Sequence, residues 1–491
     1  MADNSISRRA FLTKTGAAAT YLTVVPSIVL GRKVGKTAPS DKLNIAVTGV
    51  GGRGFELTKN MQSENIVALC DVDWKFGEKC FNAFPKAKRY FDWRKMLDEN
   101  VKLIDAVIIA TPDHTHAVIA ANAITLGKHV YCETPLTHSV YESRLLTRLS
   151  KKYQIATQMG NQGSSQEGVR KICEWIWNDE IGDVLKVDAF TDRPFWAQGL
   201  ARPRQSMMVP DTLNWDLFTG PAALRPYHEI YTPLNWRGWW DFGTGAFGDM
   251  AGHVLHPVYK ALKLNAPTRI QGSSTSLLRD NAPNAQIIRM VFPERKSEAR
   301  VKFPEIELTW QDGGLQPMKP QNWPAGRNMN VAGGGALFHG TKDTLVCGCY
   351  GKDPWLLSGR VPNVPSILSR VPNENHEMDW VHACKESIEN RMATSSSFSD
   401  AGPFSEMITL GVLAVRLQNL HRELLWDQEE MCFINIGDEL IQFYEQDNYS
   451  SPPRNTEPDK KVSHTVSARQ FAEELIRHSY RKGWALPEMP E

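Results

Sequence analysis

Short apolar runs alternate with segments of helical periodicity over the first third of the chain. The runs are LNIAV, IVALC, AVIIATP (106–112) and HVYCE (129–133), and Leu57 and Met61 show the four-residue spacing of a helix face. Strands that alternate with helices predict a parallel, doubly wound α/β sheet. Ligands of such sheets bind beyond the carboxyl ends of the strands. We place those ends at Gly49, Asp71, Thr111–Pro112 and Glu133–Thr134.

A second set of strand-like runs follows residue 160. The runs are VLKVDAF, IIRMVFP, IELTW and a hairpin, ALFHGTKDTLVCGCYG, with its turn at Lys342–Asp343. Segments 376–390 and 406–424 have helical periodicity and are expected to pack on this second region. Strands that follow the first sheet in this way indicate a second α/β domain.

The length of 491 residues and the 42% hydrophobic content predict a globular chain with two cores. Residues 450–462 are typical of a linker, and 468–480 of a short amphipathic helix. We therefore divide the chain into a leader (1–36), a dinucleotide-binding domain (41–160), a second α/β domain (161–435) and a C-terminal extension (436–491).

The first 36 residues differ from the rest of the chain in charge. They carry six basic residues and one acid, and without them the net charge changes from +1 to about −4. A chain with this acidic balance is not expected to bind nucleic acid. Arg8–Arg9 and the mildly apolar stretch that follows are similar to a bacterial twin-arginine export signal. We predict a periplasmic or otherwise exported protein without a stable membrane span.

A glycine-rich turn joins the first apolar run to the first helical segment. The turn has G-x-G-x-x-G spacing, at Gly49, Gly51 and Gly54. Such a turn lets a pyrophosphate approach backbone N–H groups at a helix start. Asp71 follows where a carboxylate accepts from a ribose diol and repels a 2′-phosphate, and Asp73 is the alternative carboxylate. NAD is the predicted cofactor, and Arg53 in the turn leaves NADP as the alternative.

Several motifs in order make the chain similar to one family. They are GVGGRG (49–54), CDVD (70–73), ATPDHTH (110–116), GKHVYCETPL (127–136), GNQG (160–163) and WRGWWDFGTGAFGDMAGHVLHP (236–257). In these motifs the chain resembles the glucose–fructose oxidoreductase, inositol dehydrogenase and rhizopine catabolism (Gfo/Idh/MocA) family over roughly residues 45–430. The resemblance implies a Rossmann domain, then an α/β domain whose open, mostly antiparallel sheet borders the active site and often forms the interface of a homo-oligomer, here a dimer or tetramer.

The resemblance also implies positions around the cofactor. Pro112 would lie beside the nicotinamide, His116 near that pocket, and Glu133 near the nicotinamide ribose. Thr111 and Asn161, from the same motifs, are assigned to the cofactor site with them.

Three ionisable residues in GTGAFGDMAGHVLHP are candidates for proton transfer. If 247–256 is helical, Asp249 and His253 share a face at i and i+4, and His256 joins them. A neutral imidazole can take a hydroxyl proton while a carboxylate stabilises the imidazolium that forms. The resemblance indicates the same pair, Asp249 and His253. The three could also suit a metal by type, but no fourth ligand is placed, so we predict no metal.

Thr134 stands where the family has the lysine of its E-K-P motif. A hydroxyl can orient a substrate oxygen but cannot supply the positive charge that stabilises a developing alkoxide. We therefore expect that His253 acts alone, that Arg193 or Arg237 supplies the cation, or that the site does not turn over at ordinary speed.

Aromatic residues near the presumed cleft favour a carbohydrate ligand. Trp196 and Trp236 lie in RPFWAQG and NWRGWWDF, beside Arg193 and Arg237. Flat rings flanked by hydrogen-bonding groups suit the apolar face and hydroxyl rim of a sugar. Three functions follow as hypotheses: an exported NAD-dependent sugar or glycoside oxidoreductase, an NAD-dependent glycoside hydrolase, or a sugar- or cofactor-binding protein without turnover.

Overall fold

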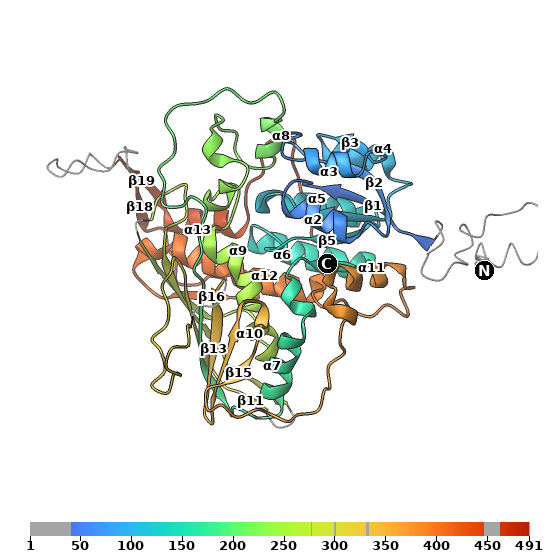
Figure 1. The fold of residues 1–491 in the computed structure, drawn as a ribbon. Helices are drawn as coiled ribbons and strands as arrows, with labels where there is room; N and C mark the ends of the chain where they lie inside the picture. Colours follow the sequence, from blue (N-terminus) through green and yellow to red (C-terminus); the bar gives the residue numbers. More distant parts are fainter. Residues whose placement is uncertain (1–40, 276, 299–300, 330–332, 446–461, 491) are drawn as a thin grey trace, which may run out of the picture. The chain divides into compact units, whose positions relative to one another are not determined.

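A six-stranded parallel sheet is the centre of the first domain in the computed structural model, which describes residues 41–490 except 276, 299–300, 330–332 and 446–461 (Figure 1). The strand order is β3-β2-β1-β4-β5-β6, the order of a doubly wound dinucleotide fold. Its strands are β1 (Asn44–Thr48), β2 (Asn65–Cys70), β3 (Lys88–Tyr90), β4 (Ala106–Ile109), β5 (His129–Cys132) and β6 (Thr157–Met159). The predicted parallel sheet is confirmed.

Helices cover both faces of this sheet, because its strands are apolar on both sides. Ala46 and Val107 point into a core shared with α4 (Trp93–Asn100), α5 (Asp113–Thr125) and α6 (Val140–Tyr153). Val47 and Ile108 point into the core on the other side, shared with α2 (Arg53–Asn60), α3 (Glu78–Ala83) and α11 (His376–Lys385). The beginning of α6 is fixed by a capping box between Ser139 and Glu142.

A nine-stranded sheet forms the second half, in the order β15-β14-β13-β7-β12-β9-β8-β16-β17. Only β7 and β12 run parallel, so the sheet is mostly antiparallel, as expected. Its strands are β7 (Val184–Phe190), β8 (Arg269–Ser274), β9 (Gln286–Phe292), β12 (Ile306–Gln311), β13 (Gly335–Gly340), β14 (Thr344–Gly348), β15 (Trp355–Leu356), β16 (Leu424–Asp427) and β17 (Cys432–Phe433). The predicted hairpin is β13–β14, with His339 paired to Thr344.

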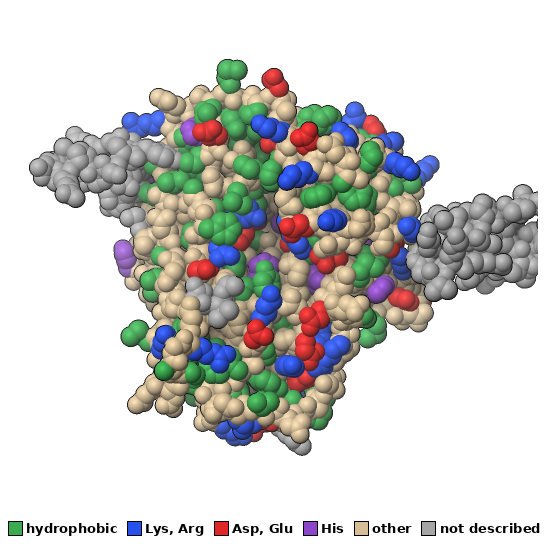
Figure 2. Space-filling model, viewed as in Figure 1, with side chains coloured by type: hydrophobic (Ala, Val, Ile, Leu, Met, Phe, Trp, Pro, Cys, Tyr) green, Lys and Arg blue, Asp and Glu red, His purple; other side chains and the backbone are tan. Residues whose placement is uncertain are grey.

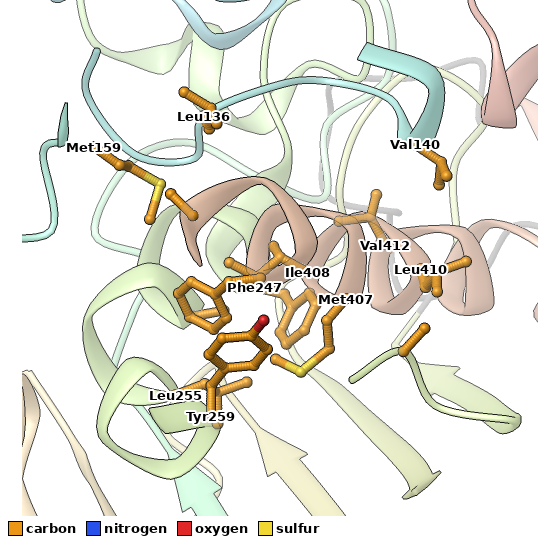
Figure 3. Close-up of a cluster of buried hydrophobic side chains, with 14 of the residues drawn as sticks. Leu136, Val140, Met159, Phe247, Leu255, Tyr259, Met407, Ile408, Leu410 and Val412 are labelled. Atoms are coloured by element: carbon orange, nitrogen blue, oxygen red, sulfur yellow. The ribbon is translucent and has the colours of Figure 1, made fainter. Parts of the chain in front are cut away.

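Helix α12 (Phe398–Arg416) joins the two halves (Figure 3). Met407 and Ile408 of this helix pack in one apolar cluster with Phe247, Leu255 and Tyr259 of the second domain. The same cluster contains residues of α6 and of the loop after β5, so the helix lies against both domains. The predicted helix 406–424 begins and ends earlier in the structure, at Phe398 and Arg416, and Leu424 is the first residue of β16.

Several predicted boundaries in the second half differ from the structure. The predicted helix 247–256 is two helices, α9 (Gly245–Val254) and α10 (His256–Ala261), divided at Leu255. The C-terminal helix is α13 (Ala468–Ile476), and the predicted helix at 376–390 ends at Lys385. Apart from short 3-10 helices, the other described elements are α7 (Glu167–Trp177), α8 (Trp215–Thr219), and two antiparallel strand pairs. These are β10 (Arg295–Glu298) with β11 (Val301–Phe303) and β18 (Leu440–Glu445) with β19 (Val462–Ser467).

Some predictions concern residues outside the described part of the chain. The twin-arginine segment falls within residues 1–40, and most of the predicted linker within 446–461. Among the described helices, none is long and apolar enough to cross a membrane.

Candidate functional site

Two adjoining cavities lie at the carboxyl edge of the parallel sheet. The first, of about 370 Å³, is lined by the glycine turn, the end of β2 and a segment of the second domain. The second, of about 320 Å³, lies between the loop after β5 and helix α9. Figure 2 shows charged and histidine side chains gathered around the hollow on this face. Both cavities are lined by Arg53, Ala110, Thr111, Trp236 and Arg237.

Close packing explains the glycines of the turn. Gly49 has φ +73°, and a Cβ there would lie 2.5 Å from the carbonyl oxygen of Ala110. A Cβ on Gly54 would lie 1.7 Å from the carbonyl oxygen of Gly49, so helix α2 starts directly against the strand end. A Cβ on Gly51 would meet the ring of Phe76 at 2.0 Å. The turn is therefore built for close backbone approach, and Phe76 covers part of it.

Asp71 orders the glycine turn from the end of β2. Its Oδ2 accepts hydrogen bonds from the backbone N–H groups of Val50 (2.8 Å) and Gly51 (3.1 Å), and its Oδ1 from Asp73 (2.9 Å). Burial raises the pKa of the Asp71 carboxyl to about 6, although these hydrogen bonds favour the charged form. The Asp73 carboxylate instead accepts from the N–H groups of Lys75 and Phe76. Of the two candidates, Asp71 is the one bonded to the turn.

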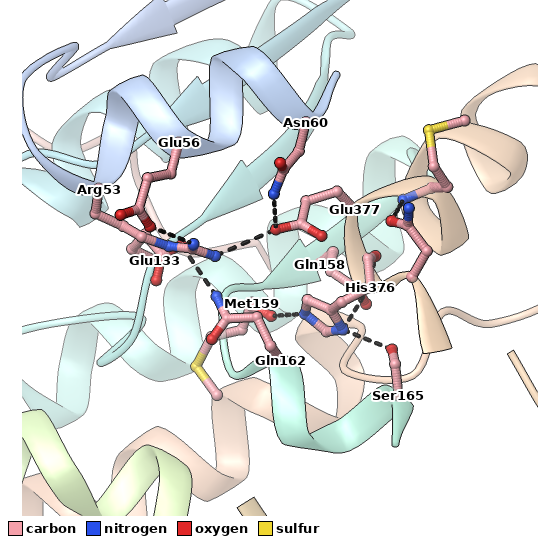
Figure 4. A network of polar contacts seen from close by, with 12 residues as sticks. Arg53, Glu56, Asn60, Glu133, Gln158, Met159, Gln162, Ser165, His376 and Glu377 are labelled. Carbon is pink, nitrogen blue, oxygen red and sulfur yellow. Dashed lines mark hydrogen bonds and ion pairs between the residues drawn. The ribbon is translucent and has the colours of Figure 1, made fainter. Parts of the chain in front are cut away.

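Arg53 is engaged by carboxylates at the second cavity (Figure 4). Its Nε lies 3.0 Å from Glu133, and its terminal nitrogens lie 3.1 Å from Glu56 and 3.2 Å from Glu377. Glu133 also accepts a hydrogen bond from Gln162, at 3.3 Å. Because its guanidinium is bound in this way, Arg53 gives no support to a site for a 2′-phosphate.

The four remaining residues assigned to the cofactor site, Thr111, Pro112, His116 and Asn161, do not all line the same cavity. Thr111 and Pro112 line the first cavity, and Pro112 precedes helix α5. His116 lines the second, but its ring nitrogens each lie 2.8 Å from a carbonyl oxygen, of Thr111 and Pro135, and burial lowers its pKa. His116 therefore lies between the loops that contain these two carbonyl groups. Asn161 is buried, with 1% of its surface exposed, and it lines neither cavity. Its side-chain amide atoms have no hydrogen-bond partner among the described residues.

Asp249 and His253 both line the second cavity from helix α9. The Asp249 carboxylate accepts a hydrogen bond from Nε of Arg237 at 2.9 Å, and Nδ1 of His253 has no partner among the described residues. The ring of His253 packs against Tyr350, with 4.8 Å between centroids. Burial lowers the pKa of His253 to about 4, against the effect of Asp249. The imidazole is therefore neutral near pH 7.

Thr134 lies directly opposite this helix. Its Oγ1 is buried without a hydrogen-bond partner among the described residues, and Thr134 lines the second cavity. A Cβ on Gly252 would lie 2.1 Å from that oxygen, so the glycine allows the helix to approach the loop. A buried hydroxyl without a partner is unusual, and this one belongs to a residue that lines a cavity.

His256 does not join this pair, contrary to the prediction from helix spacing. The chain divides at Leu255, and Nε2 of the buried His256 lies 3.4 Å from the partly exposed carboxylate of Asp400. No group of three or more metal-ligating side chains occurs among the described residues.

The four candidates for sugar contact divide into two pairs. Trp236 and Arg237 line both cavities, and the Arg237 guanidinium lies 4.3 Å from the Trp236 ring. Arg193 pairs with Asp192 and lies over Phe195, and Trp196 donates to Gln198 at 2.8 Å. The second pair is outside both cavity linings.

Several residues of the second cavity were not among the predicted site residues, among them Asp113 and Tyr350. Asp113 is buried, accepts from the hydroxyl of Thr244 at 2.7 Å, and has its pKa raised by burial to about 7. Its position after a strand end was a usable signal. Tyr350 has a left-handed backbone, with φ 66°, which is unusual for an aromatic residue. No sequence pattern places its ring against His253.

Two family models match the chain. The model described as "Oxidoreductase family, NAD-binding Rossmann fold" (GFO_IDH_MocA) matches residues 43–161, and "Oxidoreductase family, C-terminal alpha/beta domain" (GFO_IDH_MocA_C2) matches residues 169–316. Together they cover more than half of the chain.

Characterised relatives match parts of the sequence. Levoglucosan dehydrogenase of Pseudarthrobacter phenanthrenivorans is 28% identical over 166 residues, 33% of this chain and 34% of that protein. Alpha-N-acetylgalactosaminidase of Shewanella oneidensis is 28% identical over 340 residues, 61% of this chain and 64% of that protein. The chain thus spans less than two thirds of each relative.

A solved structure shares the fold. The WlbA dehydrogenase of Bordetella pertussis, in complex with NADH and UDP-GlcNAcA, aligns with a TM-score of 0.53 at 14% identity, over 79% of this chain and 99% of that one.

Proposed function

This chain belongs to the Gfo/Idh/MocA family of oxidoreductases, and we propose that it interconverts a ring hydroxyl and a ketone on a sugar or glycoside with NAD as cofactor. One observation carries the proposal. A neutral histidine, an Arg–Asp ion pair and an unpaired hydroxyl line one cavity, which adjoins a second cavity bordered by the glycine turn.

The residues of the first cavity fit a dinucleotide. The glycine turn admits close backbone approach, and Asp71 stands at the β2 end for a ribose diol. Apolar side chains, among them Val72 and Phe91, line the same cavity and suit an adenine ring. When bound, NAD supplies a nicotinamide ring that accepts or returns a hydride.

His253 is the base for the substrate hydroxyl. Its imidazole is neutral near pH 7, so a ring nitrogen can take the hydroxyl proton as the carbinol carbon is oxidised. The Asp249 carboxylate, in the same cavity, stabilises the imidazolium that results.

Arg237 supplies the positive charge that Thr134 lacks. The guanidinium lines the cavity with His253, and Asp249 fixes its orientation through the bond at Nε. This leaves terminal N–H groups to donate to a substrate oxygen as negative charge develops on it. The Thr134 hydroxyl is a second donor to the same oxygen.

The test begins with purified protein. It is expected to bind NAD, and a panel of monosaccharides and glycosides is expected to contain members that change the absorbance of NADH. A protein that binds no NAD, or that binds it and turns over no sugar, contradicts the proposal.

Glycoside hydrolysis is a second candidate, favoured by the match to the galactosaminidase over 61% of this chain. The same site would oxidise a ring hydroxyl, eliminate the aglycone, add water and reduce the ketone, without net change in NADH. Cleavage of an aryl glycoside that stops when NAD is removed distinguishes it from net oxidation.

We also propose export by the twin-arginine route, supported by Arg8–Arg9 and the residues after them. Replacement of both arginines by lysine is expected to retain the protein in the cytoplasm, as measured by cell fractionation. A homo-oligomer, dimer or tetramer, is proposed from the family resemblance and is measurable by light scattering.

A further inference from the structure

A segment of the second domain crosses the end of strand β2. Leu213 forms an antiparallel bridge with Asp73. The Trp74 N–H donates to the carbonyl of Thr212 at 2.9 Å, and the Asn214 N–H donates to the carbonyl of Val72 at 2.8 Å. Residues 212–220, which we call the strap, are thus hydrogen-bonded to the chain that follows Asp71.

The strap forms one wall of the first cavity. Leu213, Leu217 and Phe218 line it opposite the glycine turn and the end of β2. The strap is held from behind by an aromatic cluster, in which the rings of Trp215 and Phe218 stack at 5.0 Å. The cavity part beside Asp71 and Val72 is therefore enclosed by two domains.

The C-terminal extension fixes the other end of the strap. Arg481 donates from its backbone N–H to Pro221 (2.9 Å), from Nε to the carbonyl of Gly220 (3.1 Å), and from a terminal nitrogen to the Asp216 carboxylate (2.5 Å). Trp484 packs near Trp93, which lines the first cavity. Residues more than 250 positions apart in sequence thus hold the strap in place.

We propose that the strap holds the adenosine half of NAD in its cleft and that Arg481 locks the strap in position. This rests on the proposed function, since it takes the first cavity as the dinucleotide site. The apolar wall of Leu213, Leu217 and Phe218 covers a base placed beyond Asp71. With both ends of the strap bonded, NAD leaves only when these contacts open, and the cofactor stays bound through many turnovers.

Arg481→Ala tests the lock, with Lys482→Ala as the matched control, because Lys482 is the adjacent, exposed basic residue. Dissociation of radiolabelled NAD into excess unlabelled NAD is measured for each full-length protein. Loss of the charged hydrogen bonds is expected to speed release by about tenfold or more, with the control unchanged. Thermal unfolding of each apo-protein verifies the fold, and Asp216→Asn, which removes the carboxylate partner, is expected to reproduce the effect.

Leu217→Ala tests the strap itself, with exposed Leu224→Ala as control. In Leu217→Ala, the Kd is expected to rise about tenfold for NAD and for ADP-ribose, because both carry adenosine. The Kd for nicotinamide mononucleotide is expected to stay unchanged. If the wild-type protein binds NAD, but Arg481→Ala does not change the release of NAD and Leu217→Ala does not change its Kd, the proposed role of the strap is wrong and the proposed function is not affected. Wild-type protein that binds neither NAD nor ADP-ribose overturns the proposed function with it.

Discussion

At the scale of single residues, the second cavity combines the hydroxyl of Thr134 with an arginine from the second domain. Thr134 offers only a hydroxyl, but Arg237, some hundred residues later, reaches the same cavity. Asp249 is bound to this arginine at 2.9 Å, so it acts on two groups, the guanidinium and the imidazole of His253. The charge balance of the cavity therefore differs from one built on lysine.

His253→Gln is expected to lower kcat/KM by about 10²–10⁴, because the base for the hydroxyl proton is removed. The Kd for NAD is expected to stay unchanged. Initial rates on a sugar found in the panel provide the measurement, and His382→Gln, on the exposed side of α11, is the control. Wild-type rates in His253→Gln would assign proton transfer to another group.

Arg237→Met is expected to lower kcat by about 10²–10³, the loss typical of a removed electrostatic donor. If Arg237 takes the role of the family lysine, Thr134→Lys in the Arg237→Met background recovers part of the loss. The kcat values of four proteins are compared: wild type, Arg237→Met, Thr134→Lys and the double variant. Equal rates in the single and the double variant would show that position 134 cannot take over the charge.

The pH dependence follows from the lowered pKa of His253. The base is neutral above its pKa of about 4, so kcat/KM is expected to include a fall with decreasing pH around 4. Asp249→Asn removes a charge that favours the protonated ring, so it moves this fall to lower pH. A fall near pH 4 that stays at the same pH in Asp249→Asn contradicts the assignment.

At the scale of elements, the site depends on the contact between α9 and the loop after β5. Gly252 brings the helix within reach of Thr134, and the break at Leu255 turns His256 toward Asp400 instead of the cavity. The hydrophobic pattern of residues 247–256 fits one continuous helix, and only packing against α12 and the loop shows where it divides.

Gly252→Ala tests this contact. Alanine normally stabilises a helix by about 1 kcal/mol over glycine, but here its Cβ would meet Thr134 Oγ1 at 2.1 Å. The free energy of unfolding, from urea titration, is expected to fall by about 1–3 kcal/mol. In a Thr134→Ala background the same change is expected to cost less, because the oxygen is gone. Equal losses in both backgrounds contradict the contact.

At the scale of the whole molecule, two domains line the adjoining cavities, and the lining segments lie far apart in sequence. Helix α12 packs against both halves, and the C-terminal extension returns to the strap through Arg481. A ligand that contacts both halves binds only the folded chain, so it stabilises the whole molecule.

NAD at a hundred times its Kd is expected to stabilise the protein by about 2.7 kcal/mol, seen as a rise in Tm. NADP at the same concentration is expected to raise Tm less, because Asp71 repels a 2′-phosphate and Arg53 is engaged by Glu133. Both shifts are measured near pH 8, where Asp71 is charged. An equal or larger shift with NADP contradicts the role of Asp71.

The sequence by itself determined the parallel sheet, the glycine turn and the carboxylate at the end of β2. These depend on local periodicity and short spacings, such as the interval from Gly49 to Asp71, which the chain shows directly. It also placed Asp249 and His253 on one helix, since both lie within α9.

Only the tertiary structure decided that Arg237 lies in one cavity with His253, that Tyr350 packs on His253, and that Arg481 is hydrogen-bonded to the strap beside the first cavity. Each of these is a contact between segments distant along the chain. Periodicity reports which face of an element is buried, but not which partner it meets, because that depends on how the whole chain packs.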